Sequence, residues 1–352
     1  MFPYLIVLFI LAFFSFGEIF GMNKKTKILL FFCSFLLLFL FAGLRYDVGM
    51  DYSAYEELYH DSLSKLNPEI KEFGWRYFFY LFQNMGVPFS VVIFLISLFT
   101  LSTAFVFIWK NSPYPFLSIL IFFCFAQYYT YTFNVMRQCL ATYIFFSSLE
   151  LIQRRCLVKY MLLIGFTVFF IHTSAIILFP LYFLLHRSYS LFLKVVLIAI
   201  TLFSAKYFII LIASSETYKI YLAFEQYAAK TSITSYLLII ISSFFLILEE
   251  FIKNRTSHDN ILLNISFISL LFLLIVCLFS ETPLVLVFLR FACYFTPVLI
   301  VLLPLFIKRC FSLRSRYIVI PIIAVMFMSI FYYTLVTGGK KNKLIPYKTV
   351  VI

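Results

Sequence analysis

Three arginines in this chain stand at the ends of apolar segments and not in the middle of polar loops: Arg45, Arg137 and Arg290. An ionised side chain at membrane depth costs several kcal/mol, so it normally lines a wet cavity or meets an opposite charge. Because a guanidinium group matches phosphate oxygens in pairs, we interpret these arginines as a clamp for an anionic substrate. The alternative is that each one extends to the membrane surface or pairs with a nearby carboxylate, namely Asp47, Asp51 or Glu281.

His172 is the residue best suited to acid–base chemistry, because it lies inside an apolar segment and is followed by Thr173 and Ser174. Imidazole accepts a proton near neutral pH, so His172 is a candidate general base. The alternative is a structural histidine whose hydrogen bonds are satisfied within the protein. The other three histidines lie in ordinary polar loops and are weaker candidates.

The segment 43–59 is rich in charge and tyrosine for a stretch that adjoins apolar runs. Asp47 and Asp51 are four residues apart, and Gly49 between them favours a loop. Two carboxylates without a third ligand are a weak metal signal, so we predict no metal site. Tyr52 and Tyr55 offer flat ring faces that suit sugar rings.

The composition indicates a membrane protein. The 352 residues are 64% hydrophobic and 12% charged, with a mean hydropathy of +1.03; soluble domains have about 25% charged residues. We expect an all-α, polytopic integral membrane protein with about 11–12 transmembrane helices, forming a single transmembrane domain over residues 1–352. The net charge of +13 is spread over short loops, which indicates membrane orientation and not nucleic-acid binding.

Lysines and arginines predict the orientation of the segments. Lys24, Lys25 and Lys27 follow the first apolar run, and Arg154, Arg155 and Lys159 follow a later one, so both loops should be cytoplasmic. Residues 45–88 then form an extracytoplasmic loop, with an interfacial helix around 73–82. The segment Tyr160–Leu185 is long for one span and short for two, so we predict two short helices with a break at His172. The three arginines and His172 would all lie toward the outer face.

Several enzyme classes lack their signatures in this sequence. It has no P-loop, no HExxH, no GxSxG and no dinucleotide-binding fingerprint. We therefore expect no nucleotide and no other cofactor. Seven cysteines show no pairing or metal-binding spacing, and we interpret them as packing residues.

The motifs resemble those of one family. The residues from Gly43 to Tyr55 are similar to the GxRxxxGxDYxxY signature of the EpsG family, whose members are Wzy-like bacterial polysaccharide polymerases. Arg137 and Gln138 with Ala141, and then His172–Ala175 with Pro180, resemble the later RQxxA and HxSA elements in the same order. The ending Pro346–Lys348 is also similar to that of the family.

The resemblance implies a GT-C-like glycosyltransferase that is independent of metal. It would transfer a glycan from undecaprenyl diphosphate to a second lipid-linked repeat unit at the outer face of the bacterial inner membrane, making O-antigen (and so lipopolysaccharide), capsule or exopolysaccharide. Flippase and chain-length regulator proteins are expected partners, besides membrane lipids. Arg45, Arg137, Arg290 and Gln138 would bind the donor, with Tyr52 and Tyr55 beside the sugars. His172 would prepare the acceptor hydroxyl, while Asp47 and Asp51 orient Arg45 or the acceptor.

Two other functions remain open from the residues themselves. A transporter or flippase of lipid-linked glycans would use the same basic cavity without chemistry, but its site should be reachable from both faces near the midplane. A membrane acyltransferase would use His172 together with an acidic or asparagine partner and a tunnel from the cytoplasm.

Overall fold

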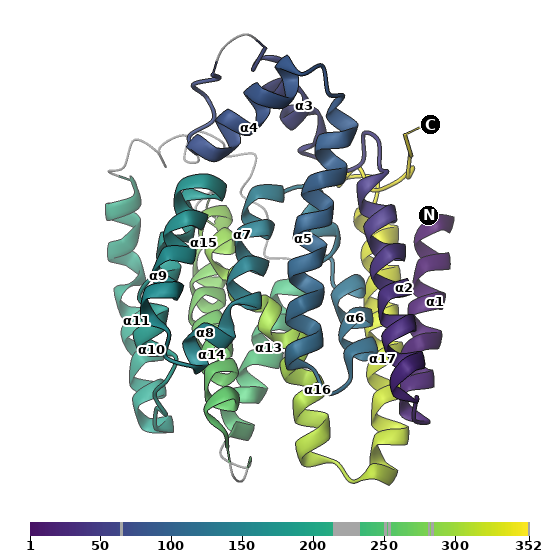
Figure 1. The fold of residues 1–352 in the computed structure, drawn as a ribbon. Coiled ribbons are helices and arrows are strands. Elements are labelled where there is room, and N and C mark those ends of the chain that lie inside the picture. The colour runs from purple at the N-terminus through teal and green to yellow at the C-terminus, as the bar shows by residue number, and fades with distance from the viewer. Residues whose placement is uncertain are drawn as a thin grey trace. The chain divides into compact units, whose positions relative to one another are not determined.

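The computed structural model describes residues 1–63, 66–213, 233–249, 252, 255–280, 282 and 285–350 (Figure 1). The chain divides into two compact units, Met1–Leu181 with Ile300–Ile352, and Tyr182–Leu299. The first unit holds α1 (Phe2–Ile19), α2 (Lys24–Gly43), α3 (Tyr52–His60), α4 (Phe73–Asn84), α5 (Phe89–Asn111), α6 (Pro115–Cys124), η1 (Thr130–Phe133), α7 (Met136–Ser147), α8 (Leu149–Gln153), α9 (Leu157–Phe166), η2 (Thr167–Ile171), η3 (Thr173–Leu178) and α17 (Leu313–Gly338). The second holds α11 (Leu191–Ala213), α13 (Ile233–Leu248), α14 (Ser257–Leu278), α15 (Val285–Ala292) and η6 (Thr296–Val298), while α10 (Leu181–Leu184) and α16 (Leu299–Cys310) cross the boundaries.

The predicted fold class is confirmed: the described residues form helices, and six helical segments among them are long and apolar enough to span a membrane. These are Phe2–Ile19, Lys24–Gly43, Phe89–Asn111, Ser257–Leu278, Val285–Cys310 and Leu313–Gly338. Other apolar segments of the described residues form shorter helices. The apolar run 116–133, for example, is α-helical only to Cys124, because the backbone turns extended at Phe125; its last four residues form the short helix η1.

The predicted helix break at His172 is present in the structure. After α9, the five residues of η2 form a π-helical turn, and His172 then takes an extended conformation (φ −158°, ψ 119°). The Tyr160 hydroxyl in α9 donates a hydrogen bond of 2.7 Å to the Leu178 carbonyl oxygen in η3, which holds the two halves against each other. Because the backbone of His172 is extended, its side chain does not follow the helical direction of the residues before and after it.

Two short helices, α3 and α4, lie across one end of α5 and α7 within the first unit (Figure 1). On α3, Tyr52, Tyr55 and Tyr59 share one buried face, as their spacing of three and four residues requires. Helix α4 buries Trp75 and Phe79. It includes residues 73–82, where the sequence predicts an interfacial helix. Its position relative to a membrane surface stays a prediction.

The C-terminal segment pairs with the loop that holds Arg45. Thr349 forms an antiparallel bridge with Arg45, and the Tyr46 amide donates to the Lys348 carbonyl oxygen at 3.0 Å. The Tyr347 ring stacks on Phe41 with a centroid distance of 4.2 Å and an interplanar angle of 18°. The lysine-rich ending therefore lies at the same end of the unit as the Arg45 loop.

The second unit is organised around α14, which packs against α11, α13 and α15. A capping box of Thr256 and Asp259 begins α14. A buried ion pair joins Lys194 of α11 to Glu249, with 2.5 Å between Nζ and each carboxylate oxygen. The ammonium also lies 5.5 Å from the centre of the Phe267 ring, so the charges have partners away from water.

Gly74 allows α4 to approach η2 unusually closely. A Cβ atom at this position would lie 2.3 Å from the Phe170 carbonyl oxygen and 2.5 Å from its Cα. Those distances are far below van der Waals contact, so any larger residue would push the two elements apart. The close approach matters because Glu72 stands two residues before Gly74 and His172 two residues after Phe170.

We predict that Gly74→Ala destabilises the first unit, because one added methyl group has no room; overpacking of this kind typically costs about 1–3 kcal/mol. The measurement is the thermal unfolding midpoint of the purified protein in detergent. Gly165→Ala is the matched control, since its Cβ would lie 3.9 Å from Phe179, an ordinary contact. Equal midpoints for Gly74→Ala and the wild-type protein would show that α4 and η2 are not packed this tightly.

Candidate active site

Arg45 is buried, with 1% of its surface exposed. Its Nη1 donates to the Ala42 carbonyl oxygen at 2.5 Å and to Ser97 Oγ at 3.1 Å, and its Nη2 lies 3.3 Å from Met136 Sδ. The guanidinium also lies 4.6 Å from the centre of the Phe133 ring. Within the part of the chain that the structure describes, Arg45 forms no ion pair with a carboxylate. It therefore joins the end of α2 to α5 and to the start of α7 through neutral groups.

The Arg45 loop also contacts the second motif directly. Gly49 has φ +104°, and a Cβ atom there would lie 2.8 Å from the Phe133 carbonyl oxygen. The following amide, of Met50, donates to Asn134 Oδ1 at 2.6 Å. A residue with a side chain could not adopt this backbone conformation at this distance. The first two motifs thus meet where η1 leads into α7.

Glu72, which is not among the residues predicted from the sequence, joins the second motif to the third. Its Oε2 accepts a hydrogen bond from Arg137 Nη1 at 2.5 Å, and its Oε1 lies 2.8 Å from His172 Nδ1. The Thr173 amide and hydroxyl also donate to Oε1, at 3.2 and 3.4 Å. The Glu72 side chain is 3% exposed, against 23% for Arg137 and 21% for His172. We call Glu72, Arg137 and His172 the polar cluster.

Local structure explains why Glu72 is available. It occupies the N-cap position of α4 but makes no side-chain cap hydrogen bond. Its carboxylate therefore turns from its own helix toward α7 and η2. The signal in the sequence was an acidic residue immediately before a predicted helix, combined with two cationic candidates that needed a counter-charge. The sequence offers Asp47, Asp51 and Glu281 as that counter-charge; Glu281 lies outside the described residues.

Tyr55 supports Arg137 from α3. Arg137 Nε donates to the Tyr55 hydroxyl at 3.4 Å, and the guanidinium carbon lies 5.6 Å from the centre of the ring. Tyr52 is 1% exposed and packs edge-on against Phe89 at 5.3 Å. Both tyrosines are largely buried. Their contact with sugar rings stays a prediction.

The remaining predicted residues lie in different surroundings. The partly exposed Asp47 binds Lys348 Nζ at 3.2 Å, and Asp51 precedes α3. Gln138 is buried next to Arg137 in α7. Arg290 belongs to the second unit, near the end of α15, and its joint action with the other arginines stays a prediction. Among the residues searched, no group of three or more histidines, cysteines or acids could hold a metal ion.

The contacts of Glu72 keep its carboxylate ionised. Burial alone would raise the pKa of Glu72, but the hydrogen bond from His172 and the charge of Arg137 outweigh it and hold the pKa at about 2. The carboxylate is therefore ionised at neutral pH and can only accept hydrogen bonds. A hydrogen bond to this carboxylate places a proton on Nδ1 of His172, so Nε2 is the ring nitrogen that can accept a proton. This is the tautomer that a general base requires.

We predict a pH-dependent contribution of Glu72 to stability. Its pKa in the folded state is about 2, below its usual 4.5, so the folded state binds fewer protons between these values. The stabilisation should be complete above pH 4.5 and disappear as the pH falls through about 2. The measurement is the difference in unfolding midpoint between the wild-type protein and Glu72→Gln across this range, with Glu69→Gln as a control in the same loop. A difference that stays constant with pH would contradict the ion pairs.

Comparison with known protein families gives a match over nearly the whole chain. A model of the EpsG family matches residues 28–349, which include the polar cluster and the Arg45 loop. No curated protein and no solved structure matches the chain, so the GT-C-like architecture stays a prediction. With its membrane-spanning helices and this match, the chain is a multi-pass membrane protein that belongs to the EpsG family of Wzy-like polysaccharide polymerases.

Proposed function

We propose that this protein transfers a glycan from undecaprenyl diphosphate to the sugar of a second lipid-linked unit, at the outer face of the inner membrane. The observation that supports it best is the Glu72 carboxylate, which joins a cation, Arg137, to a candidate base, His172. The reaction needs both groups near each other, because a proton leaves the acceptor hydroxyl while negative charge develops on the departing diphosphate.

Each member of the polar cluster has one role in this proposal. Nε2 of His172 takes the proton of the acceptor hydroxyl as its oxygen forms the new bond to the anomeric carbon of the donor. The bond from that carbon to the diphosphate oxygen breaks, and the leaving group keeps the electron pair. Arg137, which is partly exposed, stabilises that charge. Glu72 positions both side chains and balances the positive charge that His172 gains.

The other candidate residues have supporting roles. Arg45 and Tyr52 hold the loop and α3 around the cluster, and Arg45 would meet a diphosphate only after losing its contacts with Ser97 and Met136. Arg290 and Gln138 remain candidate donor ligands, and Asp47 and Asp51 remain candidates for orienting the acceptor. The reaction proceeds without a metal ion in this proposal, and a chelator tests that directly.

A second candidate, a membrane acyltransferase, is favoured by one of the same contacts. Such an enzyme would also need an acidic partner for its histidine, and Glu72 lies 2.8 Å from His172 Nδ1. The other oxygen of this carboxylate, however, binds Arg137, and a guanidinium group suits the paired oxygens of a diphosphate leaving group. Incubation with a labelled acyl donor separates the two functions: an acylated product without polymer would favour the acyltransferase.

We predict that His172→Gln lowers the rate of polymerisation by roughly 10²–10⁴-fold, the usual effect of losing a general base. Arg137→Lys should also reduce the rate sharply, because the charge remains but the paired fork is lost. The measurement is polymerisation of a purified lipid-linked unit by purified variants with a chelator present. His60→Gln, at the end of α3, is the control for losing a histidine.

Two outcomes would change this proposal. Full activity of His172→Gln would remove the base assignment. Abolition by the chelator, with recovery on adding a divalent ion, would move the chemistry to Asp47 and Asp51.

A further inference from the structure

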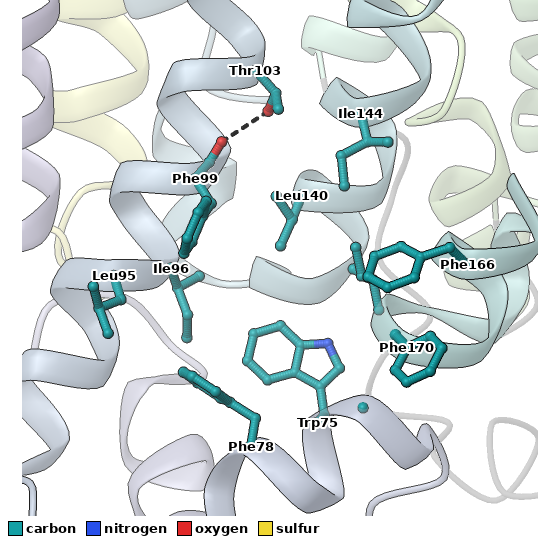
Figure 2. Close-up of a pocket in the computed structure, with 12 residues that line it drawn as sticks. Trp75, Phe78, Leu95, Ile96, Phe99, Thr103, Leu140, Ile144, Phe166 and Phe170 are labelled. Carbon is teal, nitrogen blue, oxygen red and sulfur yellow. Dashed lines mark hydrogen bonds between the residues drawn. The ribbon is translucent and has the colours of Figure 1, made fainter. Parts of the chain in front are cut away.

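An apolar cavity of about 400 Å³ lies between α4, α5, α7, α9 and η2 in the first unit. Figure 2 shows Trp75 projecting from α4 into this space, between Ile96 of α5 and Phe170 of η2. Leu140 and Ile144 line it from α7. Ligand pockets commonly have volumes of about 300–1,000 Å³, so the cavity is large enough for part of a lipid chain.

The cavity adjoins the polar cluster along three separate segments. Ile171 lines it and immediately precedes His172; Gly74 lines it and follows Glu72 by two residues. On α7, Leu140 lies about one turn beyond Arg137. An apolar chamber whose lining residues lie within one to three residues of a cation, a carboxylate and an imidazole suits an amphiphile with a charged head.

The Trp75 indole gives an independent sign of a ligand. Trp75 is 5% exposed, and its Nε1 has no hydrogen-bond partner among the described residues. A buried donor without an acceptor costs about 1–3 kcal/mol, so such groups usually have a partner in the working protein. A head-group oxygen of a bound amphiphile would supply the missing acceptor.

The cavity is open to the protein surface between α5 and α9. Two of its lining residues, Phe99 on α5 and Phe166 on α9, are 58% and 51% exposed. A chain that is longer than the cavity can therefore continue outward past these rings. In a membrane protein this direction leads to the hydrocarbon of the bilayer.

We propose that this cavity holds the head-proximal part of the isoprenoid chain of the lipid-linked substrate. The chain lies against Trp75 and Ile96, its phosphate lies at Arg137, and the remaining isoprene units extend past Phe99 into the bilayer. This inference rests on the proposed function, because that function supplies a lipid-linked substrate. It adds the residues that recognise the lipid and set its depth relative to His172.

The test uses Trp75 as its own reporter. The chain has two tryptophans, so Trp109→Phe leaves Trp75 alone. We expect a saturable change in Trp75 fluorescence when undecaprenyl monophosphate is titrated into phosphatidylcholine nanodiscs that contain this variant. Adding Ile144→Phe or Thr103→Phe, which fill the cavity from two different helices, should weaken the apparent affinity at least tenfold. Ile322→Phe, on the exposed face of α17, is the matched control and should leave the affinity unchanged.

Dioleoyl phosphatidic acid, which presents a phosphate on acyl chains, is the second ligand. An equal response to both ligands would overturn the inference, because the cavity would then be an ordinary membrane-lipid site. An unchanged affinity in both filled variants would overturn it too. Binding and catalysis are read separately. Specific binding by a protein that does not polymerise would refute only the proposed function, whereas polymerisation with an unchanged KM in the filled variants would refute only this inference.

Discussion

A single buried carboxylate constrains the centre of the first unit. Glu72 has almost no exposed surface, and an ionised group so deeply buried requires charged or hydrogen-bonding partners. It meets them in Arg137 and His172, which follow it by 65 and 100 residues. The contact with η2 at Gly74 and the support of Arg137 by Tyr55 both serve to bring these groups within hydrogen-bond distance. Removing Arg137 would leave the Glu72 carboxylate without its ion-pair partner, and removing Glu72 would leave Arg137 and His172 without the group that joins them, so the cluster is expected to act as one unit.

The buried charge of Arg45 is compensated by neutral groups instead. Its charge meets a carbonyl oxygen, a hydroxyl, a thioether and an aromatic ring, and no carboxylate within ion-pair distance among the described residues. These contacts fix the loop between α2 and α3, and the C-terminal segment pairs with the same loop through Thr349. The family's motifs thus divide into a buried scaffold around Arg45 and a partly exposed cluster around Arg137 and His172.

Much of this arrangement could be predicted from the sequence. Hydropathy gave the helical membrane class, and the polar interruption at His172 gave the break between η2 and η3. Helix lengths were less predictable, because backbone turns at Phe125 and Ser148 fall within segments of uniform hydropathy. Glu72 was missed because its loop has other charges and its partners lie far along the chain. Only tertiary structure reveals which carboxylate meets them.

The most direct test of this account is a double-mutant cycle on the polymerisation rate, with Glu72→Gln, His172→Gln and both together. If Glu72 acts by holding His172 in the tautomer of a base, then Glu72→Gln should cost little further activity once His172 has been replaced. The double variant should therefore be about as slow as His172→Gln alone, since residues that act as a unit are strongly non-additive. Independent losses that multiply in the double variant would contradict the central role of this contact.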